Sequence, residues 1–279
     1  MPRPSRALLS HPITRSIARA GTFRFLRSAL RLLSRRGLFL QLAPNTPLRS
    51  LLRLGSDYGG WVLRPDSSIS QGWVISAGAG EDISFDIELL SQFDPLIVIV
   101  DPTPRAVEHV TQIIQRGFEE SRCDYETNGK QPPDSYDLTG IDRSRIQLVN
   151  KALWTDNETL TLYAPASDQH VSYSAIRPNR NADNSIQVET VRIVDLVKIF
   201  GTPPVLVKLD IEGVACDVIL DMLKEEIRPS QLLVEFDELL KPTKKDLQKV
   251  KRTHRVLQRH GYRRIYSDRW SNFLYVLET

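Results

Sequence analysis

The chain has 279 residues, of which 41% are hydrophobic and 25% charged, an ordinary globular composition that supports a full hydrophobic core. Its two cysteines, Cys123 and Cys216, lie far apart, and no CxxC or His/Cys cluster occurs, which argues against a disulfide framework or a structural zinc site and favours a reducing compartment. The net charge of +3 is unevenly distributed, because residues 1–56 hold 11 Arg and no Lys, Asp or Glu. The rest carries 26 of the 37 basic residues and all 34 acidic ones, so this acidic body is not expected to bind nucleic acid.

Residues 22–36 have the spacing of an amphipathic helix. They contain no apolar run of about 18 residues, as a transmembrane helix needs, and arginines interrupt what would be a signal peptide. Three interpretations stay open: a helix on an anionic membrane surface, an organellar transit peptide, and a helix packed on the body. The expected location is the cytoplasm or the membrane surface, with organellar import open. The arginine face holds Arg24, Arg27, Arg31 and Arg35, and the apolar face Phe23, Leu26, Leu30 and Leu33.

Residues 57–279 form the predicted main domain, in which apolar runs alternate with helical patterns as in an α/β sheet. The turn-rich residues 121–143 are expected to form a loop that could act as a lid. In chain order, we expect strands at 74–76, 96–100, 146–149, 159–163, 188–193, 205–209 and 232–236. We expect helices at 83–93, 104–118, 216–226 and 244–260, and a closing antiparallel hairpin of 264–266 with 273–276.

In open parallel sheets, ligands bind beyond the carboxyl ends of the strands. This rule selects five short segments that directly follow or end predicted strands. They are Gly78–Asp82, Asp101, Ala152–Trp154, Asp210–Glu212 and Glu235–Asp237.

The segment "VISAGAGEDISFD" places two glycines, Gly78 and Gly80, after the first strand of the domain, and Asp101 ends the next. This layout is typical of nucleotide-binding loops, in which glycines allow close backbone approach and the acid binds ribose hydroxyls. Glu81 and Asp82 can simply stabilise a helix N-terminus by about 0.3–1 kcal/mol, but they would repel a pyrophosphate there. An adenosine ligand with a positive charge, such as S-adenosylmethionine, suits the loop better.

A second constellation lies in "VLVKLDIEG", where Lys208 and Asp210 share a face of a buried strand and Glu212 follows its end. Such charges are costly in a buried strand unless they are paired or functional. A structural Lys–Asp pair is the alternative interpretation. Glu235 and Asp237, after "LLV", repeat the pattern more weakly.

Six segments in this order resemble the FkbM family of class I S-adenosylmethionine-dependent methyltransferases: "ISAGAGEDISFD", "IVDPTP", "NKALW", "VETVRIVDL", "VKLDIEGVACDV" and "LLVEFDE". The resemblance covers about residues 57–277, and "YGGW" at Tyr58–Trp61 also resembles bacterial members with a glycan context. It implies a Rossmann-like class I fold with a mostly parallel seven-stranded sheet and an antiparallel terminal hairpin. It also implies methylation of a hydroxyl on a glycan, glycolipid or secondary metabolite.

The resemblance also assigns residues to the cofactor, S-adenosyl-L-methionine. Two departures are Ser76, where class I proteins usually have an acid, and Asp82, where they have the last glycine. Either Glu81 or Asp82 is then expected to bind the methionine ammonium. The cofactor residues implied are Gly78, Ala79, Gly80, Glu81, Asp82, Asp101, Pro102, Ala152, Leu153 and Trp154.

For catalysis we expect Asp210 to act as the base or to orient the acceptor hydroxyl, with Lys208 keeping it ionised and Glu212 binding acceptor or cofactor. No metal is expected, although Asp210, Glu235 and Asp237 could support a metal-assisted version. The residues expected to bind the acceptor are Ser172, Ser174, Glu235 and Asp237.

The five histidines form no catalytic triad, and His109 is among those expected at the surface. Two rival functions remain. One is a nicotinamide- or nucleotide-sugar-dependent enzyme of Rossmann type, which would need the missing third glycine. The other is a catalytically impaired methyltransferase-like module that binds at a membrane surface.

Overall fold

The computed structural model describes residues 47–116, 124–163, 185–240 and 242–278. The amphipathic segment 22–36 and the expected acceptor residues Ser172 and Ser174 lie outside these ranges. Within the described ranges, no helix is both long and apolar enough to cross a bilayer.

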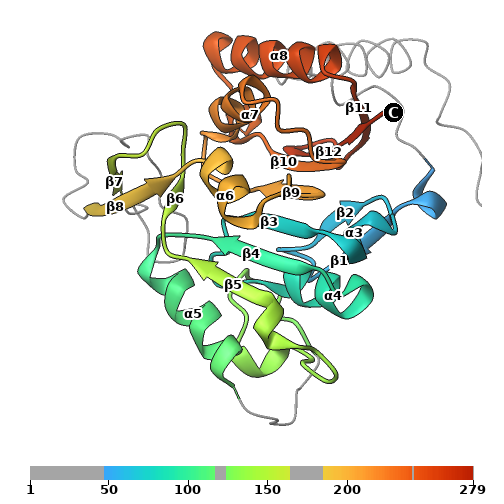
Figure 1. Cartoon of the computed structure of the whole chain (residues 1–279), viewed down its shortest axis with the longest axis vertical. Coiled ribbons are helices and arrows are strands. Elements are labelled where there is room, and N and C mark those ends of the chain that lie inside the picture. Colours follow the sequence, from blue (N-terminus) through green and yellow to red (C-terminus); the bar gives the residue numbers. More distant parts are fainter. Residues whose placement is uncertain (1–46, 117–123, 164–184, 241, 279) are drawn as a thin grey trace, which may run out of the picture.

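A seven-stranded sheet forms the centre of the molecule, with the strand order β11-β12-β10-β9-β3-β4-β5 (Figure 1). Its five parallel strands are β3 (Trp73–Ala77), β4 (Leu96–Val100), β5 (Ile146–Val149), β9 (Leu206–Leu209) and β10 (Gln231–Glu235). The hairpin of β11 (Tyr262–Ser267) and β12 (Asn272–Leu277) joins them through the antiparallel pair β10–β12. The predicted α/β class, with a mostly parallel seven-stranded sheet and an antiparallel terminal hairpin, is confirmed.

Helices cover both faces of this sheet. Side chains alternate between the faces along each strand, so each buried strand contributes to both of the hydrophobic layers under these helices. Ile75 and Val207 pack with α6 (Ile193–Phe200), α7 (Ala215–Lys224) and α8 (Lys244–Arg259). Val74 and Leu206, their neighbours, pack with α4 (Ser84–Phe93), α5 (Pro104–Gln115) and the short α3 (Ser68–Gln71). Every residue of β3 is buried, so the strand is the middle of two hydrophobic layers.

Two smaller sheets flank the main one. The hairpin of β1 (Leu52–Leu54) and β2 (Trp61–Leu63) packs with α4, and its Leu54, Trp61 and Leu63 are buried in the core. A three-stranded sheet contains β6 (Ala152–Leu153), β8 (Ser185–Val191) and β7 (Thr159–Tyr163). Four single 3-10 turns complete the described chain, at Leu48–Ser50, Pro133–Ser135, Arg143–Arg145 and Asp237–Leu239.

One local prediction is wrong. The strand expected over 188–193 ends at Val191, and Ile193 instead begins α6, which the sequence did not predict because its Ile and Val residues favour strands. The helix ends at Gly201, whose φ of +76° provides the left-handed conformation common after helices. The described part of the predicted loop, residues 124–143, has both exposed and buried members, among them Gln131 and Tyr136 at 3% and 0% exposure, and its role as a lid stays a prediction.

Candidate functional site

A cavity of about 620 Å³ opens at the carboxyl ends of the parallel strands. It lies where the strand order reverses, because β3 pairs with β4 on one side and with β9 on the other. Every described residue that the sequence singled out for cofactor, catalysis or acceptor lines this cavity. These residues are Gly78, Ala79, Gly80, Glu81, Asp82, Asp101, Pro102, Ala152, Leu153, Trp154, Lys208, Asp210, Glu212, Glu235 and Asp237.

The glycine loop connects β3 to the turn before α4 and approaches the end of β9. Gly78 has a φ of +81°, and a Cβ on it would lie 1.7 Å from the carbonyl oxygen of Asp210. Gly80 also has a positive φ, +52°, but its missing side chain would meet no atom within 4 Å. Gly78 is therefore required by the fold, whereas Gly80 leaves room at the cavity for a ligand to approach the backbone.

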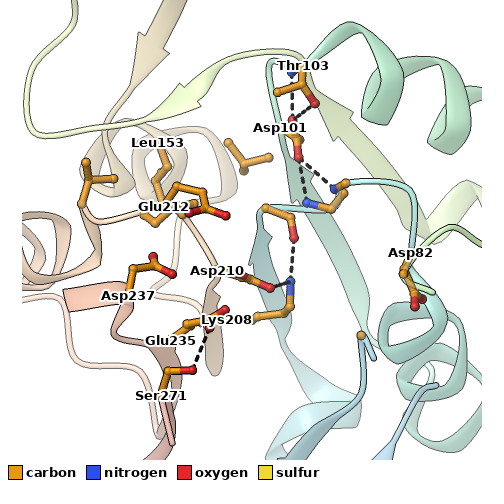
Figure 2. Close-up of a pocket in the computed structure, with 18 of the residues that line it drawn as sticks. Asp82, Asp101, Thr103, Leu153, Lys208, Asp210, Glu212, Glu235, Asp237 and Ser271 are labelled. Atoms are coloured by element: carbon orange, nitrogen blue, oxygen red, sulfur yellow. Dashed lines mark hydrogen bonds and ion pairs between the residues drawn. The ribbon is translucent and has the colours of Figure 1, made fainter. Parts of the chain in front are cut away.

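Asp101 ends β4 and is 5% exposed. Its Oδ2 accepts hydrogen bonds from the amides of Ala79 (2.8 Å) and Gly80 (3.1 Å), while Oδ1 accepts from the amide and hydroxyl of Thr103 (2.8 and 2.7 Å). Figure 2 shows these bonds linking the glycine loop to the start of α5. The acid expected to bind ribose therefore also shapes the loop.

Among the described residues that line the cavity, Lys208 alone has a Lys or Arg side chain. It is 3% exposed, and its Nζ donates to the carbonyl oxygen of Gly78 at 2.7 Å and lies 4.0 Å from Oδ2 of Asp210. The ammonium also lies 5.6 Å from the centre of the Trp61 ring. Lys208 thus joins the glycine loop to the end of β9 and gives Asp210 a nearby positive charge.

Glu81 and Asp82, the two candidates for the methionine ammonium, already have protein partners. Glu81 pairs with Arg105 at 2.5 Å. The carboxylate of Asp82 accepts from the Ser84 amide (2.9 Å), the Ser56 hydroxyl (2.6 Å) and the Gln131 side chain (3.1 Å). Both line the cavity, but Asp82 also fixes the entry to α4 and connects three segments of the chain.

Carboxyl groups gather on the β9–β10 side of the cavity, facing the glycine loop across it (Figure 2). Burial raises the pKa of Glu235, with further contributions from Asp210 and Asp237, and the Ser271 hydroxyl donates to Glu235 at 2.8 Å. Burial and the nearby Glu212 raise the pKa of Asp237 to about 7. Some of these groups therefore retain a proton near neutral pH and can donate hydrogen bonds as well as accept them.

The three-stranded sheet provides an apolar wall. Ala152 and Leu153, both buried, lie on β6, and Leu160 and Leu162 of β7 reach the same cavity. The indole of Trp154 donates to Glu158 at 2.9 Å, which fixes its orientation. Such a wall suits the flat, largely apolar face of an aromatic base.

Several residues of the site were not assigned by sequence reasoning. Tyr58, Trp61, Trp270 and Ser271 line the cavity from the β1–β2 and β11–β12 hairpins, and only "YGGW" gave a signal for the first two. His109, expected at the surface, is 7% exposed.

The buried His109 contacts Tyr136, whose hydroxyl in turn binds the backbone that follows the glycine loop. Its Nε2 lies 2.8 Å from the Tyr136 hydroxyl, which accepts from the Ile83 amide at 3.2 Å. Burial lowers the pKa of His109 to about 4, so it is neutral at physiological pH. The contact depends on residues 27 positions apart, which no local pattern reveals.

Among the described residues, no group of three or more His, Cys, Asp or Glu side chains is placed to hold a metal ion. No protein-family model matches the chain, and no curated protein matches its sequence. A solved structure with some similarity is a mutant of the 16S rRNA (adenine(1408)-N(1))-methyltransferase from Catenulisporales acidiphilia. It is 13% identical with a TM-score of 0.33, over 81% of this chain and 95% of that one. A TM-score this low says nothing about function.

Proposed function

We propose that this chain is an S-adenosylmethionine-dependent O-methyltransferase of class I fold, acting on a hydroxyl group of a glycan, glycolipid or secondary metabolite. One observation carries the proposal. The glycine loop, Asp101 at the end of the next strand, and the carboxylates after β9 and β10 all meet at one cavity at the switch point of the sheet.

The residues of the cavity fit a cofactor with an adenosine end and a cationic end. In this proposal the ribose approaches the open space at Gly80 beside Asp101, and the base lies against the apolar wall of Ala152–Trp154. Carboxylates outnumber Lys208, the basic residue of the described lining, which favours a sulfonium and an ammonium and disfavours a pyrophosphate.

When bound, S-adenosylmethionine would supply an activated methyl group, whose carbon–sulfur bond breaks as the bond to the acceptor oxygen forms. Asp210 is the proposed base for the hydroxyl proton, since it is 35% exposed toward the cavity and has the Lys208 ammonium 4.0 Å away. The Lys208 ammonium lies beside Asp210 and donates to the Gly78 carbonyl, so it positions the base relative to the loop.

The rival functions make different demands on the same cavity. A nicotinamide-dependent enzyme needs a site for a pyrophosphate, whereas the Glu81 and Asp82 carboxylates lie just before the N-terminus of α4. A catalytically impaired binding module would retain the cavity but not depend on Asp210. Peripheral membrane contact through residues 22–36 is compatible with any of these functions.

Calorimetric titration of the full chain with S-adenosylhomocysteine, alongside NAD, tests the cofactor directly. We expect micromolar binding of S-adenosylhomocysteine and none of NAD. Binding of NAD alone would instead identify a nicotinamide-dependent enzyme. Binding of neither would remove the basis of the proposal.

A further inference from the structure

Among the described residues, three large hydrophobic side chains are strongly exposed: Tyr58 (66%), Ile199 (73%) and Trp270 (50%). Tyr58 and Trp270 line the same cavity, although they are 212 positions apart in the chain. Exposed aromatic rings beside a cavity are typical of ligand-binding sites, because they offer a flat apolar surface at low entropic cost.

Tyr58 lies in the turn between β1 and β2, and tight backbone packing determines where that turn runs. A Cβ on Gly59 would lie 2.6 Å from the Asp82 carboxyl carbon, and one on Gly60 would lie 2.4 Å from the Ser56 carbonyl oxygen. A Cβ on Gly129 would lie 2.4 Å from the Tyr58 ring, so the ring packs directly on that glycine. The glycines of "YGGW" therefore bring the ring to the cavity.

Trp270 lies in the turn between β11 and β12, which hydrogen bonds hold in place. Oδ1 of Asp268 accepts from the amides of Trp270 (2.6 Å) and Asn272 (3.1 Å). Arg269, between Asp268 and Trp270, has a φ of +68°, an uncommon conformation for a residue other than glycine. The Ser271 carbonyl accepts from the Phe236 amide at 2.9 Å, which attaches the turn to the end of β10.

Both aromatic residues line the cavity together with Glu235. The Ser271 hydroxyl, next to Trp270, donates to Glu235 at 2.8 Å. Tyr58 shares the cavity with Asp210 and Glu235, and partial burial and the charges of these two groups raise the pKa of its hydroxyl. Two exposed rings thus flank a wall of carboxyl groups that both donate and accept hydrogen bonds.

We propose that Tyr58 and Trp270 form the acceptor subsite, which takes a neutral polyhydroxylated ring, with its apolar face against the aromatic side chains and its hydroxyls toward Asp210 and Glu235. This inference rests on the proposed methyl transfer to a hydroxyl and identifies the residues that select the acceptor. Sugar rings combine an apolar face with hydroxyl groups that both donate and accept hydrogen bonds, as the carboxyl groups of the cavity do. A ligand with an ammonium group only donates, so it matches these carboxyl groups less well. The carboxyl groups of the cavity repel phosphorylated acceptors.

Saturation-transfer NMR on the full chain, with and without S-adenosylhomocysteine, tests the subsite. The probes are the methyl glycosides of glucose, galactose and mannose, with glucose phosphate as the anionic probe and cyclohexylamine as the cationic one. We expect at least one glycoside to receive saturation, and both charged probes to receive less. Tyr58→Ala and Trp270→Ala should each weaken glycoside binding by about two- to tenfold. Tyr58→Phe, which keeps the ring, should weaken it less than Tyr58→Ala does. Ile199→Ala, outside the cavity lining, should leave it unchanged.

Calorimetry with S-adenosylhomocysteine separates the two proposals. If it binds the wild type and both alanine variants alike, while glycosides bind the alanine variants more weakly than the wild type, both proposals stand. If it binds and no glycoside does, or if the alanine variants bind glycosides normally, the subsite is refuted and the methyltransferase proposal survives. If glycosides bind through Tyr58 and Trp270 but S-adenosylhomocysteine does not, the methyltransferase proposal fails alone. Stronger binding of cyclohexylamine or glucose phosphate refutes a neutral acceptor.

Discussion

Gly78 and Asp210 touch through their backbones at the centre of the cavity, so closely that a Cβ on Gly78 would lie 1.7 Å from the Asp210 carbonyl oxygen. Two β-strand ends that are 132 residues apart in sequence meet at this contact. Lys208 reinforces it by donating to the Gly78 carbonyl at 2.7 Å. The proposed cofactor loop and the proposed base are therefore parts of one rigid unit.

The first prediction compares the two glycines of the loop. Gly78→Ala should prevent stable folding or destabilise the chain by more than about 3 kcal/mol, because it combines a backbone clash with a positive φ. Gly80→Ala meets no atom and should cost only about 1–2 kcal/mol from its φ of +52°. Urea unfolding measures both, and equal losses would contradict the difference in packing. Gly80→Ala should nevertheless weaken binding of S-adenosylhomocysteine, since its methyl group enters the open space of the loop.

The second prediction concerns Asp86, a buried acid of α4 that is 1% exposed. Burial raises its pKa, and Lys208 is the largest opposing influence, so we expect the two to stabilise each other. Lys208→Met alone should destabilise the chain by about 3–5 kcal/mol. Adding Asp86→Asn should recover part of that loss, with a coupling of about 1–3 kcal/mol in urea unfolding.

The control for this double-mutant comparison is Asp210→Asn. It removes the second carboxylate near Lys208, which lies 4.0 Å from the ammonium and is 35% exposed. Solvent screens this pair more, so its coupling to Lys208→Met should be smaller than that of Asp86→Asn. Strictly additive losses for Lys208 and Asp86 would show that the two charges do not interact across the sheet and helix.

The third prediction is a pH dependence of stability. The pKa of Glu235 is raised above its usual value of 4.5, so above that value the folded state holds a proton that the unfolded state has released. The free energy of unfolding then falls as the pH rises through this range. Glu235→Gln removes the titration, and its stability relative to wild type should increase by about 1–3 kcal/mol between about pH 5 and about pH 8.

Asp237→Asn should show the same trend, complete by about pH 8 because the pKa of Asp237 is raised to about 7. Asp57→Asn is the matched control, since the Asp57 side chain is 92% exposed. Urea unfolding of the ligand-free chain at several pH values measures all three. A difference from wild type that does not change with pH would mean that Glu235 ionises normally in the folded state.

The fourth prediction separates binding from chemistry. Asp210→Asn keeps the shape of the side chain but removes the proposed base, so binding of S-adenosylhomocysteine should change little. Transfer of a radiolabelled methyl group to a glycoside that binds the chain should fall by about 10²–10⁴-fold. Transfer at the wild-type rate would exclude Asp210 as the base.

Much of the fold follows from local patterns. Short apolar runs correctly predicted five parallel strands, and "LIVIV" and "IQLV" match β4 and β5 in their bounds. The α8 helix begins where Thr243 and Asp246 form a capping box, a signal that lies within four residues. Elements whose signals conflict were missed, as α6 was, because its β-branched residues favour a strand while Gly201 favours a helix end.

By itself, the sequence determined which segments come to the functional edge, because parallel strands place all their carboxyl ends on one side of the sheet. The tertiary structure decided what each side chain does there. It gave Asp82 three partners, buried His109 against Tyr136, and brought Tyr58 and Trp270 to one cavity. Apart from the Asp82–Ser84 bond, these contacts join residues tens to hundreds of positions apart. Their strength depends on burial and distance, which periodicity and spacing along a chain do not encode.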